Sequence, residues 1–429
     1  MAPPLIFLPA GTADKWFRAI CANLLFSCDD SVTAMNAGVQ MHRRLPAGVW
    51  LLGTASLFMD VSSELVHSLL PVFMASVLGA SVLTIGIIEG VAEATVAITK
   101  VFSGALSDYL RHRKWIVVFG YALAAFAKPM FPLAQSIAWV FSARFIDRIG
   151  KGIRGAPRDA LIADITPPQL RGAAYGLRQA LDSAGAVIGP LLAVGFMIWL
   201  VDDIRAVLWV SVIPAFIAVS LLLFLREPRV LAAVGAAPRW SATGAMMLPA
   251  RYWVIVTLGG VFTLARFSEA FLILRAHDVG LALGQVPWVL VIMSLSYALF
   301  AYPAGTAADR VNHRMLLLAG IAPLIAADLV LAAAQSALPV WFGCALWGLH
   351  MAMTQGLFAK LVADVAPQRL RGTAFGIFNL AAGLALLLAS VIAGTLWTVC
   401  GPALTFWAGA GFAALAGFGV LFVRTPQQS

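Results

Sequence analysis

A dense run of charge stands in the middle of an otherwise apolar sequence. The stretch DRIGKGIRGAPRD, residues 147–159, carries six charged side chains in thirteen residues and follows the apolar run SIAWVFSARF. Arg144, Asp147, Arg148 and Lys151 are spaced i, i+3, i+4 and i+7, which places them on one stripe of a helix. Guanidinium, ammonium and carboxylate groups on one face of an intramembrane helix are suited to bind a charged solute or to relay protons.

The depth of this run divides it into two parts. Counted from Ile137 at about 1.5 Å per residue, Arg148 lies roughly 16 Å deep, near the middle of a bilayer. Charges at that depth normally face a bundle interior or a watery cavity, so we expect a functional role for Arg148. Arg154 and Arg158 lie about 26 to 32 Å along the helix, and we expect them to anchor its cytoplasmic end and to contribute to a gate.

Such a stripe needs carboxylates opposite it, because isolated burial of charge is costly. Acids at helical spacing occur in several other apolar stretches: Asp60 and Glu64 with His67, Glu89 and Glu93, Asp182 with Arg178, and Glu269 with Arg266. Asp328, Lys100, Lys128 and Lys360 are further candidates.

We expect protonation of Asp60 or Glu64 to be set by two opposing effects, desolvation and a nearby guanidinium such as that of Arg148. A proton and a substrate would then compete for one site. The alternative is a permanent salt bridge that holds the first and fourth spans together.

The composition defines the elements that must position these groups. The chain has 429 residues, of which 61% are hydrophobic and 11% charged, so we predict an all-α integral membrane protein. About twelve windows are long and apolar enough to span a bilayer. They lie near 48–76, 82–106, 115–134, 137–162, 173–199, 204–225, 252–275, 286–307, 315–335, 338–362, 371–397 and 401–423.

The basic residues give the topology. The net charge of +9 is concentrated in even-numbered loops and the tails, whereas odd-numbered loops carry only Arg205 and Arg275. Because Lys and Arg near span ends favour the cytoplasm, we predict cytoplasmic termini, an even number of spans and a bacterial-type inner membrane. The predicted parts are an N-terminal arm (1–46), a six-helix bundle (47–226), a linker (227–250), a second bundle (251–424) and a tail (425–429).

The two halves repeat in sequence. ADITPPQLRGAAYGL at 163–177 and ADVAPQRLRGTAFGI at 363–377 agree at eight of fifteen positions, and GALSDYLRHRK at Gly104 returns as GTAADRVNHRM at Gly305. The offset of about 200 residues spans six helices, an even number, so the halves point the same way. This indicates a parallel repeat about an axis along the membrane normal.

These loops resemble the G-x-x-x-D-(R/K)-x-G-(R/K)-(R/K) motif of the major facilitator superfamily, which implies twelve helices in two pseudo-symmetric bundles. The first half keeps three of its positions, with Tyr109 and Arg111 departing from the pattern. The resemblance implies that acids and bases at the cytoplasmic rim lock an outward-open state. These gating residues are Gly104, Asp108, Arg113 and Arg171 in the first half, and Gly305, Asp309, Arg310, Arg314 and Arg371 in the second.

Two further patterns resemble the proton-coupled drug antiporters of that superfamily. Gly176, Gly185, Gly189 and Pro190 are similar to its span-five antiporter motif, with Ala193 and Val194 in place of the usual closing glycine pair. Small residues let a neighbouring helix approach closely, and glycine-rich packing alone is the alternative explanation. Arg148-x-x-Lys151-Gly152 is similar to an R-x-x-Q-G element, with Lys in place of Gln.

These patterns predict a secondary active transporter of a small molecule, working by proton-coupled efflux, as a monomer in a lipid bilayer. The alternatives are a proton-coupled uptake symporter, a metal permease using the HMAM cluster at 350–353, and a membrane receptor that does not transport. We expect no cofactor, no nucleic-acid partner and no enzymatic activity, because no P-loop, G-x-S-x-G or H-E-x-x-H pattern occurs. The four cysteines lack CxxC spacing and are predicted to be unpaired.

Overall fold

The computed structural model describes residues 45–110, 112–225, 247–310, 313–354, 357–367 and 370–422. Leu45–Ser429 forms one compact unit. Within the described ranges every regular element is a helix. The predicted arm (1–46), apart from its last two residues, most of the linker (227–250) and the tail (425–429) lie outside these ranges, as do the side chains of several residues at the helix ends.

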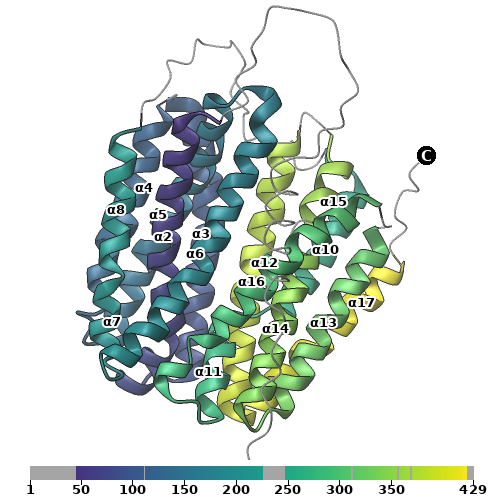
Figure 1. Ribbon diagram of the computed structural model, residues 1–429. Coiled ribbons are helices and arrows are strands. Elements are labelled where there is room, and N and C mark those ends of the chain that lie inside the picture. Colours follow the sequence, from purple (N-terminus) through teal and green to yellow (C-terminus); the bar gives the residue numbers. More distant parts are fainter. Residues whose placement is uncertain are drawn as a thin grey trace, which may run out of the picture. The chain divides into compact units, whose positions relative to one another are not determined.

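The first half is drawn purple to teal in Figure 1. Its helices are α2 (Ala47–Val72) with the π-helical turn η1 (Phe73–Val77), α3 (Val82–Leu110), α4 (Arg113–Ala127) with the 3-10 turn η2 (Lys128–Met130), α5 (Ile137–Ile165), the 3-10 turn η3 (Pro168–Leu170), α6 (Arg171–Trp199), α7 (Ile204–Val210) and α8 (Val212–Leu223).

The second half is drawn green to yellow. Its helices are α10 (Ala250–Leu264), α11 (Ala270–Asp278), the 3-10 turn η4 (Leu283–Gln285), α12 (Trp288–Arg310), α13 (His313–Ala333), α14 (Ala337–Thr354), α15 (Leu357–Val365), α16 (Arg371–Cys400) and α17 (Pro402–Phe422).

Nine helical stretches of the described chain are long and apolar enough to cross a membrane. The twelve spans that the sequence predicts would need three more crossings, and α4 with η2, α5, and α10 with α11 occupy the predicted positions. α5 has the length, but its charged residues lower its apolar character. The sequence predicts one continuous span over 252–275, whereas the structure breaks it between Leu264 and Ala270.

Local signals in the sequence set several helix starts. The Ser136 hydroxyl accepts a hydrogen bond from the backbone N–H of Trp139 at the start of α5, and the Asp203 carboxylate accepts one from Ala206 at the start of α7. Both side chains satisfy donors that a first helical turn leaves without partners. The Ser136 cap fixes where the charged helix α5 begins, and therefore how deep its basic residues lie.

Equivalent bases tie the rim of each half. Lys114 Nζ donates to the backbone oxygen of Leu223 at the end of α8 at 3.0 Å, and Arg314 Nη2 donates to that of Leu421 at the end of α17 at 2.5 Å. Lys114 and Arg314 are 200 residues apart, as in the sequence repeat. The repeat is therefore present in the contacts as well as in the sequence. We call the end of the bundle with these two contacts the linker end, because α8 ends there.

The halves meet along α3 and α16 and along α6 and α12. Glycines allow the α3–α16 approach: a Cβ on Gly86 would lie 2.5 Å from the backbone oxygen of Ser390, and one on Gly394 would lie 2.8 Å from the Cα of Leu83. Only hydrogen fits at such separations, so two helix backbones approach closely here. Leu83 is in the first turn of α3, which places this seam toward the end opposite the linker end.

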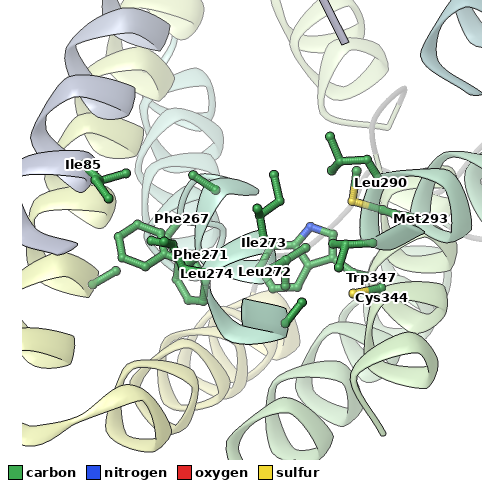
Figure 2. Close-up of a cluster of buried hydrophobic side chains, with 14 of the residues drawn as sticks. Ile85, Phe267, Phe271, Leu272, Ile273, Leu274, Leu290, Met293, Cys344 and Trp347 are labelled. Atoms are coloured by element: carbon green, nitrogen blue, oxygen red, sulfur yellow. The ribbon is translucent and has the colours of Figure 1, made fainter. Parts of the chain in front are cut away.

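A large apolar core supports the broken helix. Phe267 in the break and Phe271 on α11 lie among Ile85 of α3, Met293 of α12 and Trp347 of α14 (Figure 2). Phe267 and Phe271 pack edge to face with ring centroids 5.4 Å apart. The break is thus held by side chains from both halves of the chain, beside the charged residues Arg266 and Glu269.

Candidate functional site

A charged cavity lies between the two halves. It consists of two adjoining lobes of about 510 and 450 Å³. Six residues line both lobes, which joins them into one vestibule: Glu64, Val96, Lys100, Lys151, Glu269 and Met351. A volume of this size is typical of sites for small organic molecules.

The stripe on α5 forms the part of the vestibule wall that belongs to the N-terminal half of the chain. It also supplies the buried residues that support this wall. Arg144 and Glu89, both at most 1% exposed, form an ion pair of 2.6 Å between α5 and α3. Arg148 faces the cavity and pairs with Glu93 at 3.4 Å, and Lys151 lines both lobes. Of the predicted stripe, Arg148 and Lys151 therefore face the cavity, whereas Arg144 and Asp147 line neither lobe and lie behind the wall.

Asp147 is the support of this wall. Its Oδ1 accepts a hydrogen bond of 2.8 Å from Nζ of Lys128, which also donates to the Ser63 hydroxyl at 3.0 Å. The other oxygen of Asp147 lies 3.5 Å from Nε of Arg148. Lys128 and Asp147 are 1% and 3% exposed, so this pair is a fully buried link that orients Arg148.

The acids of α2 have partners other than Arg148. Asp60 Oδ1 lies 3.9 Å from Nη2 of Arg154, and Glu64 Oε2 lies 3.6 Å from Nδ1 of His67. The guanidinium of Arg154 also stacks over the Tyr121 ring at 4.6 Å. The ion pair between α2 and α5 is therefore formed by Asp60 and Arg154, at a separation long enough to break easily.

Arg154 and Arg158 differ from their expected role as surface anchors. Both line the second lobe, where Arg158 donates to the Ser56 hydroxyl and lies 3.9 Å from Asp182. The signal was present in the sequence, since Lys151, Arg154 and Arg158 continue the helical stripe at i, i+3 and i+7. A position near a helix end does not distinguish a residue that faces lipid headgroups from one that faces a cavity opening.

Asp182 on α6 completes this cluster. Its two oxygens accept hydrogen bonds from Ser56 at 2.6 Å and from Arg178 at 2.8 Å. Arg178 also donates to Asp159 at 2.9 Å. These contacts connect α2, α5 and α6 around the second lobe, with Arg158 and Arg178 sharing two carboxylates.

The glycine pattern of α6 lies against the acids of α2. A Cβ on Gly185 would meet the Asp60 Cβ at 2.9 Å, and one on Gly189 would meet the backbone oxygen of Val61 at 2.7 Å and the Glu64 Cβ at 2.9 Å. Pro190 is buried next to this contact. Gly176 is different, because no atom lies within 4 Å of its Cβ position. The part of the pattern that packs is the part that positions Asp60 and Glu64.

The C-terminal half contributes the broken helix and an aromatic wall. Arg266 and Glu269 lie in the break between α10 and α11 and line the first lobe. The Ser268 backbone N–H donates to the Ser390 hydroxyl at 3.3 Å, which ties the break to α16. Phe267, Trp347, Met351 and Leu386 add apolar surface. The sequence located the two charges but not the break, which the polar segment ARFSEA could have indicated.

The structure describes the side chains of only some of the predicted gating residues. Gly104 packs against Ala156 of α5, with 3.4 Å to its Cβ position, and Arg113 pairs with Asp164 at 3.2 Å. Arg171 is exposed at the start of α6, and the Gly305 Cβ position has no atom within 4 Å. The side chains of Asp108, Asp309, Arg310 and Arg371 lie outside the described structure, so the two acidic gates stay a prediction.

No group of three or more His, Cys, Asp or Glu side chains among the described residues is arranged to hold a metal ion. His350 of the HMAM cluster is buried, with its Nδ1 2.7 Å from the backbone oxygen of Gly320. The described residues therefore add no support for metal permeation.

Two repeated helical halves with a charged cavity between them define a membrane transporter of small solutes. A family model of the Major Facilitator Superfamily matches residues 51–275 and 262–429. The chain belongs to this superfamily and is a multi-pass membrane protein.

Curated relatives agree with this assignment. An uncharacterised MFS-type transporter of Methanocaldococcus jannaschii is 32% identical over 397 residues, covering 89% of this chain and 96% of the relative. The multidrug resistance protein MdtH of an Enterobacter species is 25% identical over 344 residues, covering 79% of this chain and 83% of the relative.

Solved structures share the fold. The nucleoside transporter NupG has a TM-score of 0.69 at 14% identity and covers 88% of this chain and 98% of its own. A D-xylose–proton symporter has a TM-score of 0.68 at 16% identity and covers 87% of this chain and 96% of its own. The predicted fold class is thereby confirmed.

Proposed function

We propose that this protein exports a small molecule in exchange for protons by alternating access. The observation that carries the proposal is the vestibule between the halves, in which carboxylates on α2 and in the α10–α11 break face basic residues on α5. The likeness to a multidrug resistance protein supports export. We further propose that the protein is a monomer in the inner membrane with both termini in the cytoplasm.

The weak pairing of the acids supports the proposed coupling to protons. Asp60 lies 3.9 Å from Arg154, and Glu64 lies 3.6 Å from His67, whereas the supporting pairs behind the wall are 2.6 and 2.8 Å apart. Burial favours a neutral carboxyl and a nearby base favours a carboxylate, so a small displacement of the base exchanges a proton. A substrate that draws the base away from the carboxylate would cause such a displacement and so exchange a proton.

The packing of the halves supports the proposed alternating access. The close α3–α16 seam runs from Leu83 and Gly394 to Gly383 and Ala97, where a Cβ on Gly383 would lie 2.7 Å from that of Ala97. The second lobe lies nearer the linker end, since Arg178 and Arg158 belong to the first turns of α6 and the last turns of α5. Rocking the halves would open the seam and close the other end.

The opposite direction of coupling is the second candidate. Likeness in fold to a proton symporter favours it, since the same architecture can move solute and proton together. The two mechanisms differ in one observable, the direction in which protons move when a solute gradient is imposed.

Proteoliposomes filled with a pH-sensitive dye measure that direction. A solute gradient directed outward should acidify the lumen for an antiporter and alkalinise it for a symporter. Asp60→Asn and Glu64→Gln should abolish the pH change while solute counterflow persists. Proton movement that survives in both variants would refute the role of these acids, and binding without any flux would show a receptor.

A further inference from the structure

Bases outnumber acids on the vestibule wall. Seven Lys and Arg side chains line the two lobes against five Asp and Glu side chains. Each of the five acids already has a basic neighbour: Asp60 has Arg154, Glu64 has His67, which carries charge only when protonated, Glu93 has Arg148, Asp182 has Arg178, and Glu269 interacts electrostatically with Arg266.

The five acids take four of the seven bases together with His67, and Arg158 pairs with Asp159 at 3.2 Å. Lys100 and Lys151 are the two bases left over. Neither forms an ion pair within 4 Å with any residue that the structure describes, although both line both lobes. The acids within electrostatic range of them, such as Asp159 and Glu64, are held by other partners. Two ammonium groups therefore face the cavity without an ion-pair partner among the described residues.

The two lysines are neighbours. The stem of Lys100 crosses α5 at Gly155, where a Cβ would lie 3.7 Å from Cδ and Cε of Lys100. Gly155 is one helical turn from Lys151, and side chains at this spacing start about 5–6 Å apart. Lys100 of α3 and Lys151 of α5 therefore present their ammonium groups to one region, where the lobes join.

An apolar surface lies in the same vestibule. Phe267, Trp347, Met351 and Leu386 from the C-terminal half line the first lobe together with the two lysines. A solute that spans both surfaces needs one anionic end and one apolar end.

We propose that the transported solute is an amphipathic organic anion whose carboxylate, phosphate or sulfonate binds between Lys100 and Lys151. This inference rests on the proposed transport function and names its substrate class. A cationic solute is disfavoured, because it would have to displace a base from an acid that is already paired, leaving that base without a partner.

A charge series with one apolar group tests the proposal. The purified protein in zwitterionic lipid nanodiscs is titrated calorimetrically with 1-naphthylacetate, 1-naphthyl phosphate, 1-naphthylmethylammonium and neutral 1-naphthalenemethanol. At least one anion should bind about tenfold more tightly than the cation and the neutral alcohol, as expected for a charge-assisted contact. Equal or tighter binding of the cation overturns the proposal, and the ratio of the two anions separates carboxylate from phosphate.

Variants locate the contact. Lys100→Gln and Lys151→Gln should each weaken anion binding about tenfold and leave binding of the alcohol within twofold. Lys114→Gln is the matched control, because this lysine caps α8 outside the cavity. Lys151→Arg should retain most of the affinity. Anion affinity that stays within twofold of wild type in both glutamine variants, or falls equally in Lys114→Gln, overturns the assignment.

Counterflow separates this inference from the proposed function. Anions that bind without counterflow would leave the binding site intact and refute transport. Counterflow of the naphthyl cation in preference to both anions would support transport and overturn the anion assignment.

Discussion

Replacing Gly189 with alanine tests whether the glycine pattern of α6 positions an acid of α2. The added methyl would lie 2.7 Å from the backbone oxygen of Val61, about 0.7 Å short of ordinary van der Waals contact. Backbone cannot rotate away as a side chain can, so α6 and α2 must separate. Overpacking of this kind costs about 1–3 kcal/mol.

Gly195→Ala on the same helix is the control, because no atom lies within 4 Å of its Cβ position. Both variants gain the same helix propensity, up to about 1 kcal/mol. The free energy of unfolding should therefore differ between them by about 1–3 kcal/mol, with Gly189→Ala the less stable.

The assays are thermal unfolding followed by tryptophan fluorescence, and proton-coupled flux in proteoliposomes. Gly189→Ala should show a lower unfolding midpoint and slower flux, since the Glu64 Cβ lies 2.9 Å from the added methyl. A Gly189→Ala protein as stable and as active as Gly195→Ala would refute the reasoning, and the pattern would then be ordinary glycine packing.

Three further predictions follow from individual contacts. Lys128→Met should destabilise the protein by about 3–5 kcal/mol in thermal unfolding because it leaves Asp147 charged and buried, and adding Asp147→Leu should recover most of the loss; no recovery would show that the pair is not the cause. Arg275→Gln should lower the unfolding midpoint because Arg275 donates to three backbone oxygens at the end of α13, and an unchanged midpoint would exclude this cap. In a background without the native cysteines, the variant Gly90→Cys/Leu387→Cys should form a disulfide between α3 and α16 on oxidation. This disulfide should stop flux, and a reductant should restore it. Full flux in the oxidised variant would contradict opening of the α3–α16 seam.

The sequence predicted the helices well because length and apolarity decide where a span can lie. The ends agree within a few residues, for example 137–162 predicted and Ile137–Ile165 observed for α5. The break in the seventh span was not predicted. Its residues Phe267 and Ser268 are held mainly by Trp347 and Ser390, which are distant in sequence, and Phe267 also packs against Phe271.

The site was predicted in part. Helical spacing placed Arg144, Arg148 and Lys151 on one face, because a period of 3.6 residues is a property of the local chain. The identity of each partner depends on how helices pack, which spacing does not encode. Arg148 therefore pairs with Glu93, and Asp60 with Arg154, although the sequence suggested Arg148 for Asp60.

The two exceptional arginines also have a tertiary explanation. Arg205 and Arg275 are the basic residues of the odd-numbered loops, and both donate to backbone oxygens: Arg205 to Pro132 at 2.7 Å, and Arg275 to Leu331, Ala332 and Ala334. A count of loop charges treats them as exceptions to the rule that basic residues favour the cytoplasmic side. Their contacts show that each donates to backbone oxygens at or just beyond the end of a helical segment.

The contacts of Lys114 with Leu223 and of Arg314 with Leu421 have a mechanical consequence. Each hydrogen bond connects two helices of its own half, α4 with α8 and α13 with α17. Helices connected in this way resist sliding past one another, so we expect each half to move as a rigid body. Deformation during a transport cycle would then concentrate in the seam between α3 and α16, where glycines such as Gly86 and Gly394 bring the two helix backbones close together.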